Sequence, residues 1–251
     1  MKKQDRWNEI LSYVNLNKQA SVEELADLFH VSPATIRRDL LEMEKVEVLQ
    51  RYHGGARSNS KTSAEPPMAL KVGANQASKN MVGRYAASLI KDNQMVYIDA
   101  GSATYEMLDY ITAKNISVVT IGIPHINKLV SHGIHTIVLG GSVRENTMAI
   151  IGSPVLAQLD NFYFDIAFVG TNGIHQQTGI TTVNDMEGMQ KEKAISRSKV
   201  TYALADHTKF NKIYPHAFAK FDDVWLITDN IGDYEGAPLA KCIEVQKVWN
   251  L

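Results

Sequence analysis

Cysteine is almost missing from this sequence, with Cys242 the single example among 251 residues. One thiol excludes an internal disulfide framework and a cysteine-rich zinc site, and it suits a reducing compartment. No uncharged apolar run approaches the roughly 20 residues that a membrane span needs. Residues 2–6 are polar and no apolar stretch follows them, so we expect no signal peptide. The sequence therefore predicts a cytoplasmic protein that does not contact a membrane.

An excess of charge of either sign is also missing. The chain has 26 Lys and Arg against 27 Asp and Glu, so its bulk charge indicates neither a nucleic-acid nor a membrane partner. Hydrophobic residues make up 45% and charged residues 21%, which is ordinary for a folded globular protein and excludes disordered and collagen-like classes. The length fits one large domain, or a small domain followed by a medium one.

Common catalytic and metal-binding motifs are absent as well. The eight histidines show no HExxH spacing, there is no GxSxG elbow, and Cys242 has no nearby histidine. The sequence contains neither the GxGxxG nor the GxxxxGK[ST] pattern, which disfavours dinucleotide-binding and P-loop folds. We therefore expect no cofactor and no metal ion.

Composition divides the chain into three parts. Residues 1–57 show short helical patterns and a hairpin, and residues 58–75 have the polar, proline-bearing composition of a linker. Residues 76–251 begin with an apolar helical stripe and continue with short β-branched runs spaced so that helices fit between them. These predicted strands are 95–98, 116–121, 134–139, 166–169, 200–204 and 224–227. The alternation predicts a mainly parallel α/β sheet.

Two helix starts lie close together in the first part. Ser21 and Glu24 have the spacing of a capping box, and Ser32 stands as an N-cap before Pro33 at the first helical position. About three residues separate the two predicted helices, which is typical of a helix-turn-helix.

A helical wheel shows which side of the second helix is free. Ile36, Leu40 and Met43 share the core side, and small residues and arginines occupy the other. Such a face suits contact with bases and phosphates in a DNA major groove. The candidate DNA-binding residues on this helix are Ser32, Ala34, Thr35, Arg37 and Arg38. The alternative is a plain solvated face in which Asp39 neutralises one arginine.

The segment that follows predicts a wing. Residues 48–57 suggest a strand, a Gly54-Gly55 turn and a return strand. Between residues 48 and 61 there are three basic residues, including Lys61, and no acidic one. We expect Arg51, His53 and Arg57 to lie on the DNA backbone.

These segments resemble a known family. Arg6, Ile10 and Val14, together with residues 32–40, are similar to the DNA-binding signature of the DeoR family of bacterial transcriptional regulators, and residues 53–56 match its usual wing motif. The resemblance implies a transcriptional regulator, most commonly a repressor.

Polar residues that follow the predicted strands suggest a ligand site. Residues 99–104 form a small, hydroxyl-bearing loop before a helix, and such a loop can hold a phosphate. Other strands end in Gly140-Gly141, in 170–173 and in Asp206, and the carboxyl ends of parallel strands line the ligand crevice of an open sheet. The candidate effector-binding residues are Asp99, Gly101, Ser102, Thr104, Gly141, Arg144, Lys191 and Lys209. Alternatively, Glu187 and Lys191 form a surface ion pair and Asp206 caps the next segment.

The same loops resemble the DeoR-family sensor domain. The resemblance rests on 99–102, 140–144, 179–182, Glu187 with Lys191, and 205–210. That domain is similar in fold to ribose-5-phosphate isomerase, and the resemblance implies a phosphorylated sugar as effector. The chain departs from the family pattern at residue 121, where Ile follows Thr120 in place of Asn, and at Ala103, where a second hydroxyl is common.

Together these observations predict an α/β protein with an N-terminal winged helix-turn-helix domain, a linker and a mainly parallel sensor domain. The predicted function is repression of a carbohydrate uptake or catabolism operon, with release by a phosphorylated sugar. Spaced operator half-sites favour a homodimer or homotetramer. The alternative is an isomerase-like enzyme with Glu187, Lys191 and Asp206 as acid–base groups.

Overall fold

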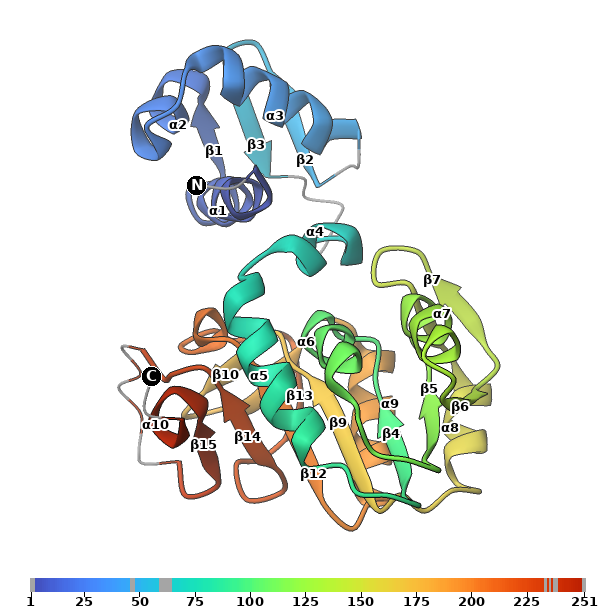
Figure 1. Ribbon diagram of the computed structural model, residues 1–251. Helices are drawn as coiled ribbons and strands as arrows, with labels where there is room; N and C mark the ends of the chain where they lie inside the picture. Colours follow the sequence, from blue (N-terminus) through green and yellow to red (C-terminus); the bar gives the residue numbers. More distant parts are fainter. Residues whose placement is uncertain are drawn as a thin grey trace. The chain divides into compact units, whose positions relative to one another are not determined.

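A computed structural model describes residues 3–45, 48–58, 65–232, 234, 236 and 239–249 of the chain. Two compact units emerge, Met1–Ala74 and Asn75–Leu251 (Figure 1). Lys61 of the predicted wing and residues 59–64 of the predicted linker lie outside the described residues. Within the described part, no helix is both long and apolar enough to cross a bilayer.

The first unit is a winged helix-turn-helix. Its elements are α1 (Lys3–Asn17), β1 (Gln19–Ser21), α2 (Val22–Phe29), α3 (Pro33–Lys45), β2 (Leu49–Tyr52), β3 (Gly55–Ser58) and α4 (Met68–Gly73). The strands form an antiparallel sheet in the order β1-β3-β2. Ile10, Leu25, Ile36, Leu40 and Met43 are fully buried between the helices and this sheet.

The predicted helix caps are present. Ser21 Oγ accepts a hydrogen bond from the Glu24 amide at 3.0 Å, and Glu24 Oε2 accepts one from the Ser21 amide at 3.2 Å. Ser32 Oγ accepts from the amide of Thr35 at 3.2 Å. Each cap satisfies amides that have no partner inside the helix, so local sequence alone places both helix starts.

Two local features differ from the prediction. The hairpin turn consists of His53 and Gly54, because Tyr52 pairs with Gly55, which already belongs to β3. A Cβ on Gly55 would lie 2.3 Å from the carbonyl oxygen of Ala20, so the close approach of β1 requires glycine there. Within the segment expected to be linker, α4 is helical, and its Leu70 joins the core of the first unit beside α1.

The second unit is built on one parallel sheet. Its elements are α5 (Gln76–Ser88), β4 (Met95–Ile98), α6 (Ser102–Met107), η1 (Leu108–Tyr110), β5 (Ser117–Thr120), α7 (Ile123–Ser131), β6 (His135–Val138), β7 (Ser142–Arg144), β8 (Ala149–Ile151), α8 (Ser153–Leu159), β9 (Ile166–Gly170), β10 (Gly173–His175), β11 (Gly179–Thr182), α9 (Asp185–Ser196), β12 (Thr201–Ala205), η2 (His207–Lys209), β13 (His216–Ala219), β14 (Trp225–Thr228), β15 (Cys242–Glu244) and α10 (Val245–Val248). Seven strands run in the order β15-β14-β12-β9-β4-β5-β6, and every neighbouring pair is parallel. All of the strands predicted from the β-branched runs are present in this sheet.

Helices cover both faces of the sheet (Figure 1). Val96 and Ile98 of β4 pack with α5, α6 and α7, whereas Tyr97 between them packs on the opposite face with α8 and α9. This alternation explains why the strands read as continuous apolar runs. Two antiparallel additions, β7-β8 and β10-β11-β13, were not predicted from the sequence.

Candidate functional site

Helix α3 presents the side predicted to read DNA. Ala34, Arg37 and Arg38 are exposed and Thr35 is half-buried, whereas Ile36 has no exposed surface. Ser32 is exposed, and its hydroxyl also lies 2.9 Å from that of Thr35. The small residues thus occupy the N-terminal end of a free helix face.

The charged groups of α3 have separate partners. Asp39 is buried, and its carboxylate accepts from Arg6 Nε at 2.6 Å and from Trp7 Nε1 at 2.9 Å. The alternative in which Asp39 neutralises Arg37 or Arg38 is therefore wrong. Arg37 lies 3.6 Å from Glu23, a loose exposed pair, and Arg38 has no ion-pair partner within the described part of the chain.

The wing adds basic groups next to this helix. Arg51, His53 and Arg57 are all exposed. Arg51 lies 3.8 Å from a carboxylate oxygen of Glu44, and Arg57 Nε donates to Gln50 at 3.2 Å. A cavity of about 210 Å³ separates α3 from the wing, and its lining includes Arg37, Arg51 and His53. The first unit therefore carries a concave surface between α3 and the wing that includes basic side chains.

In the second unit, Asp99 joins three segments at the carboxyl end of β4. Its Oδ1 accepts from the Gly101 amide and from Thr104 Oγ1, each at 2.9 Å. Its Oδ2 accepts from the Gly170 amide at 2.8 Å and from Lys191 Nζ of α9. Burial opposes ionisation of Asp99, but Lys191 and the two amides outweigh it and lower the pKa of this carboxyl.

His125 supports the same loop from α7. Its Nε2 lies 3.2 Å from Thr104 Oγ1 and 3.2 Å from the Gly101 carbonyl oxygen. A carbonyl only accepts, so Nε2 carries a proton. Complete burial lowers the pKa of His125 to about 4, so the ring is neutral near pH 7. A Cβ on Gly122 would lie 2.3 Å from the ring, so glycine is needed there.

Sequence reasoning missed His125. The available signal was its position shortly after the predicted strand 116–121, close to where the other strands end. Thr104 was expected to contact effector, but it is fully buried and its hydroxyl bonds to Asp99. The structure thus gives Thr104 a role in positioning the loop.

Glu187 and Lys191 do not form the surface ion pair considered as an alternative. Both are buried, and Lys191 bonds to Asp99 instead. Glu187 Oε1 accepts from Arg144 at 3.0 Å and from Thr147 Oγ1 at 2.7 Å. One face of α9 therefore holds both the loop after β4 and the β7-β8 hairpin.

Lys209 belongs to a second polar cluster. Asp206 Oδ1 accepts from the Thr208 amide at 3.0 Å, which confirms that Asp206 caps the following segment, and it also accepts from Asn75 Nδ2 at 3.4 Å. Burial raises the pKa of the Asp206 carboxyl, but the nearby positive charge of Lys209 lowers it. The net result is a lowered pKa. Asp206 and Lys209 thus follow β12, whereas Asp99, Gly101 and Thr104 follow β4.

The two remaining predicted effector contacts are accessible. Ser102 is half-buried at the start of α6, and its hydroxyl has no hydrogen-bond partner in the described residues. Gly141 is exposed just before β7, where a Cβ would lie 2.5 Å from the carbonyl oxygen of Ile151.

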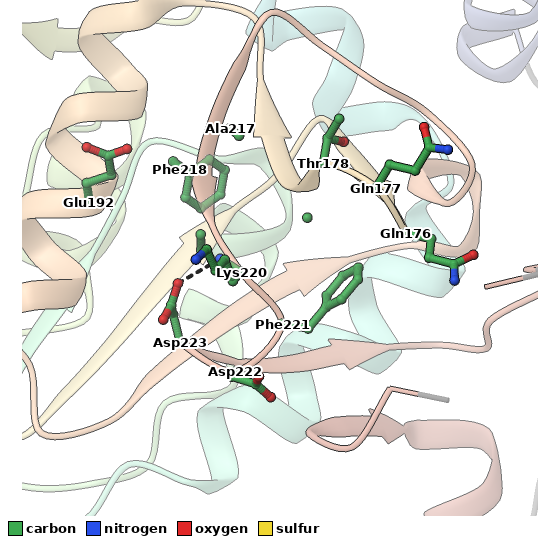
Figure 2. Close-up of a pocket in the computed structure, with 12 residues that line it drawn as sticks. Gln176, Gln177, Thr178, Glu192, Ala217, Phe218, Lys220, Phe221, Asp222 and Asp223 are labelled. Atoms are coloured by element: carbon green, nitrogen blue, oxygen red, sulfur yellow. Dashed lines mark hydrogen bonds between the residues drawn. The ribbon is translucent and has the colours of Figure 1, made fainter. Parts of the chain in front are cut away.

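A second cavity, larger than the one beside the wing, lies in the second unit and was not expected from the sequence. It has a volume of about 540 Å³ and lies between the β10–β11 turn, the end of β13 and Glu192 of α9 (Figure 2). Phe218 lines it, and the ring of Phe218 lies 5.6 Å from Lys191 Nζ.

In the described residues, no three His, Cys, Asp or Glu side chains gather in a way that could hold a metal ion.

Two models of known protein families match the chain, each over a different part of it. Residues 6–62 match the family model of the DeoR-like helix-turn-helix domain, and residues 74–230 match that of the DeoR C terminal sensor domain. A helix-turn-helix followed by a sensor domain defines a DNA-binding transcriptional regulator. The chain belongs to the DeoR family.

Individual relatives support the assignment. The chain is 39% identical to the HTH-type transcriptional regulator FruR of Bacillus subtilis (strain 168), over 89% of this chain and 90% of that protein. It is 30% identical to the lactose phosphotransferase system repressor of Staphylococcus aureus (strain MRSA252), over 94% of each. These relatives are regulators and not enzymes, so the enzyme alternative is wrong.

A solved structure of ribose 5-phosphate isomerase from Methanocaldococcus jannaschii is also similar. It covers 55% of each chain with a TM-score of 0.40 and 16% sequence identity. Such a distant likeness carries no conclusion about chemistry.

Proposed function

We propose that this protein is a cytoplasmic repressor of a carbohydrate uptake or catabolism operon and that a phosphorylated sugar releases it from DNA. The observation that carries the proposal is the Asp99 cluster, where two loops and α9 meet at the carboxyl edge of the sheet. A relative with 30% identity is named as a repressor of a lactose phosphotransferase system, which supports a carbohydrate target.

DNA binding is assigned to the concave surface of the first unit. Ala34, Thr35, Arg37 and Arg38 would enter the major groove, with Ser32 at the start of the same helix. Arg51, His53 and Arg57 of the wing would contact phosphates, which fix the register without reading sequence. Half-site recognition then requires a homodimer or homotetramer.

Effector binding is assigned to the carboxyl edge of the sheet. The hydroxyl of Ser102 and the exposed backbone at Gly141 are open to a ligand there, whereas Gly101 shapes the loop through its hydrogen bonds to Asp99 and His125. Lys191 and Arg144 supply the positive charge, and each already bonds to a carboxylate. A phosphate would therefore compete with Glu187 for Arg144 and change how the β7-β8 hairpin is held. Lys209 would contribute from the neighbouring cluster.

Operator and effector must then oppose each other. If the effector weakens DNA binding, DNA weakens effector binding by the same factor, and such coupling typically amounts to about 1–3 kcal/mol.

The test is a fluorescence-anisotropy titration of the purified protein with DNA from upstream of its own coding region. Several salt concentrations and a panel of sugar phosphates would be compared. We expect tight, salt-dependent binding that one sugar phosphate weakens. Specific binding that no sugar phosphate changes would remove the effector assignment, and no specific DNA binding would overturn the whole proposal.

A further inference from the structure

Two fully buried side chains in the second unit lack hydrogen-bond partners. The hydroxyl of Tyr97, and both the oxygen and the nitrogen of the Gln190 amide, are shielded from solvent and have no partner among the described residues. Buried polar groups are nearly always paired, because an unpaired one destabilises the fold. Neither side chain is therefore explained by the stability of the protein.

Tyr97 lies on the α9 side of the sheet, two residues before Asp99. Its ring packs against Phe164, with 5.3 Å between ring centroids, in the core that also contains Ala194 of α9. Burial, followed by the negative charges of Asp99 and Glu187, raises the pKa of Tyr97 well above its usual value. The hydroxyl thus keeps its proton.

Gln190 belongs to the helix face that builds the site. Glu187, Gln190, Lys191 and Ala194 are the side chains that α9 buries toward the sheet. Glu187 and Lys191, three residues before and one residue after Gln190, bind Arg144 and Asp99. Gln190 is therefore buried on the same helix as the two residues that hold these ion pairs, to which the effector site is assigned.

The chemistry of these groups selects one part of a ligand. An amide offers two donor hydrogens and an acceptor, and a protonated phenol offers one of each. Both are neutral and offer no positive charge to a phosphate, so they suit uncharged hydroxyl groups, which both donate and accept.

We propose that Gln190 and Tyr97 determine effector specificity by hydrogen bonding to hydroxyl groups of its sugar moiety. The inference rests on the proposed function, and it adds the residues that distinguish one sugar from another. A site that hydrogen-bonds a ligand hydroxyl discriminates strongly against an analogue without it, because the buried groups are then left unpaired.

The test uses Gln190→Leu and Tyr97→Phe in the full-length protein, because each removes polar atoms at similar side-chain volume. Glucose 6-phosphate, fructose 1-phosphate, fructose 6-phosphate and ribose 5-phosphate serve as probes, with thermal unfolding and operator release as readouts. We expect the melting temperature without ligand to be unchanged or higher. The probe that acts on the wild type should bind each variant about tenfold more weakly.

Tyr202→Phe is the matched control. Tyr202 lies in β12 and packs into the core on the opposite face of the sheet, so its loss should not alter the response to any probe. Operator affinity without effector should equal that of the wild type in all three variants.

Two results would overturn the inference while the proposed function stands. One is a lower melting temperature with unchanged response to the active probe, which would make the amide or phenol structural. The other is wild-type response and wild-type stability in both variants. If the wild type binds operator but responds to no probe, the proposed effector class fails and this inference falls with it.

Discussion

Arg6 of α1 donates from Nε to Oδ2 of Asp39 in α3 at 2.6 Å, and both side chains are buried. The second carboxylate oxygen accepts from the indole of Trp7 at 2.9 Å. The N-terminal helix thus fixes the orientation of the recognition helix, and Arg37 and Arg38 on the exposed side remain available for DNA.

Asp39→Ala should destabilise the first unit strongly. The substitution leaves Arg6 as a buried charge without its partner, and breaking such a pair costs about 3 kcal/mol or more of unfolding free energy. Urea unfolding followed by tryptophan fluorescence measures the loss, and operator affinity should fall with it. Glu42→Ala removes the partner of Lys3 in an exposed pair and should cost less than about 1 kcal/mol. Equal small losses in both variants would show that the buried pair does not hold α3.

Arg38→Ala and Arg57→Ala should affect DNA binding differently. Arg38 lies on the face assigned to the major groove, so its loss should reduce discrimination between operator and random DNA by about 1–3 kcal/mol. Arg57 lies on the wing, so its loss should weaken binding to both DNAs about equally and reduce the salt dependence. Anisotropy titrations on both DNAs at several salt concentrations measure this. Equal effects of the two substitutions would contradict the division between groove and backbone contacts.

Ser102→Ala should impair release by the effector and leave operator binding intact. The hydroxyl has no partner in the described residues and lies beside Gly101, whose amide is held by Asp99. Its removal should therefore cost little stability. Operator release by the active sugar phosphate is the readout, and Ser131→Ala, whose hydroxyl bonds within its own helix, is the control. Loss of folding or of DNA affinity in Ser102→Ala would refute the assignment of this loop to the effector.

His125 should make stability dependent on pH in the acidic range. Burial lowers its pKa from 6.5 to about 4 in the folded protein, so between these values the unfolded chain binds the proton more readily. The stabilisation is complete above pH 6.5 and is lost as the pH falls toward 4, with a total of about 3 kcal/mol. His125→Gln lacks this dependence. Urea unfolding at pH 7.5 and pH 5 should show a smaller decrease for the variant, and equal decreases would contradict the assignment.

Features that depend on neighbouring residues could be predicted from the sequence. The caps at Ser21 and Ser32 join groups three residues apart, and the free face of α3 follows from the helical repeat at Ile36 and Leu40. The strands of the parallel sheet show as apolar runs because both faces are covered by helices. The fold class and the free face of α3 could be predicted from the sequence because both follow from local patterns.

The partners of the charged side chains were decided by tertiary structure. Asp99 and Lys191 are 92 positions apart and Arg144 and Glu187 are 43 apart, so no local pattern distinguishes these pairs from the neighbouring Glu187 and Lys191. His125 lies at the site because α7 follows β5, the strand beside β4. Leu70 of α4 is buried in the core of the first unit, which explains why this part of the expected linker is helical. Local periodicity determines which residues are buried. Which buried groups meet depends on the order of strands and on helix packing, and these bring distant segments together.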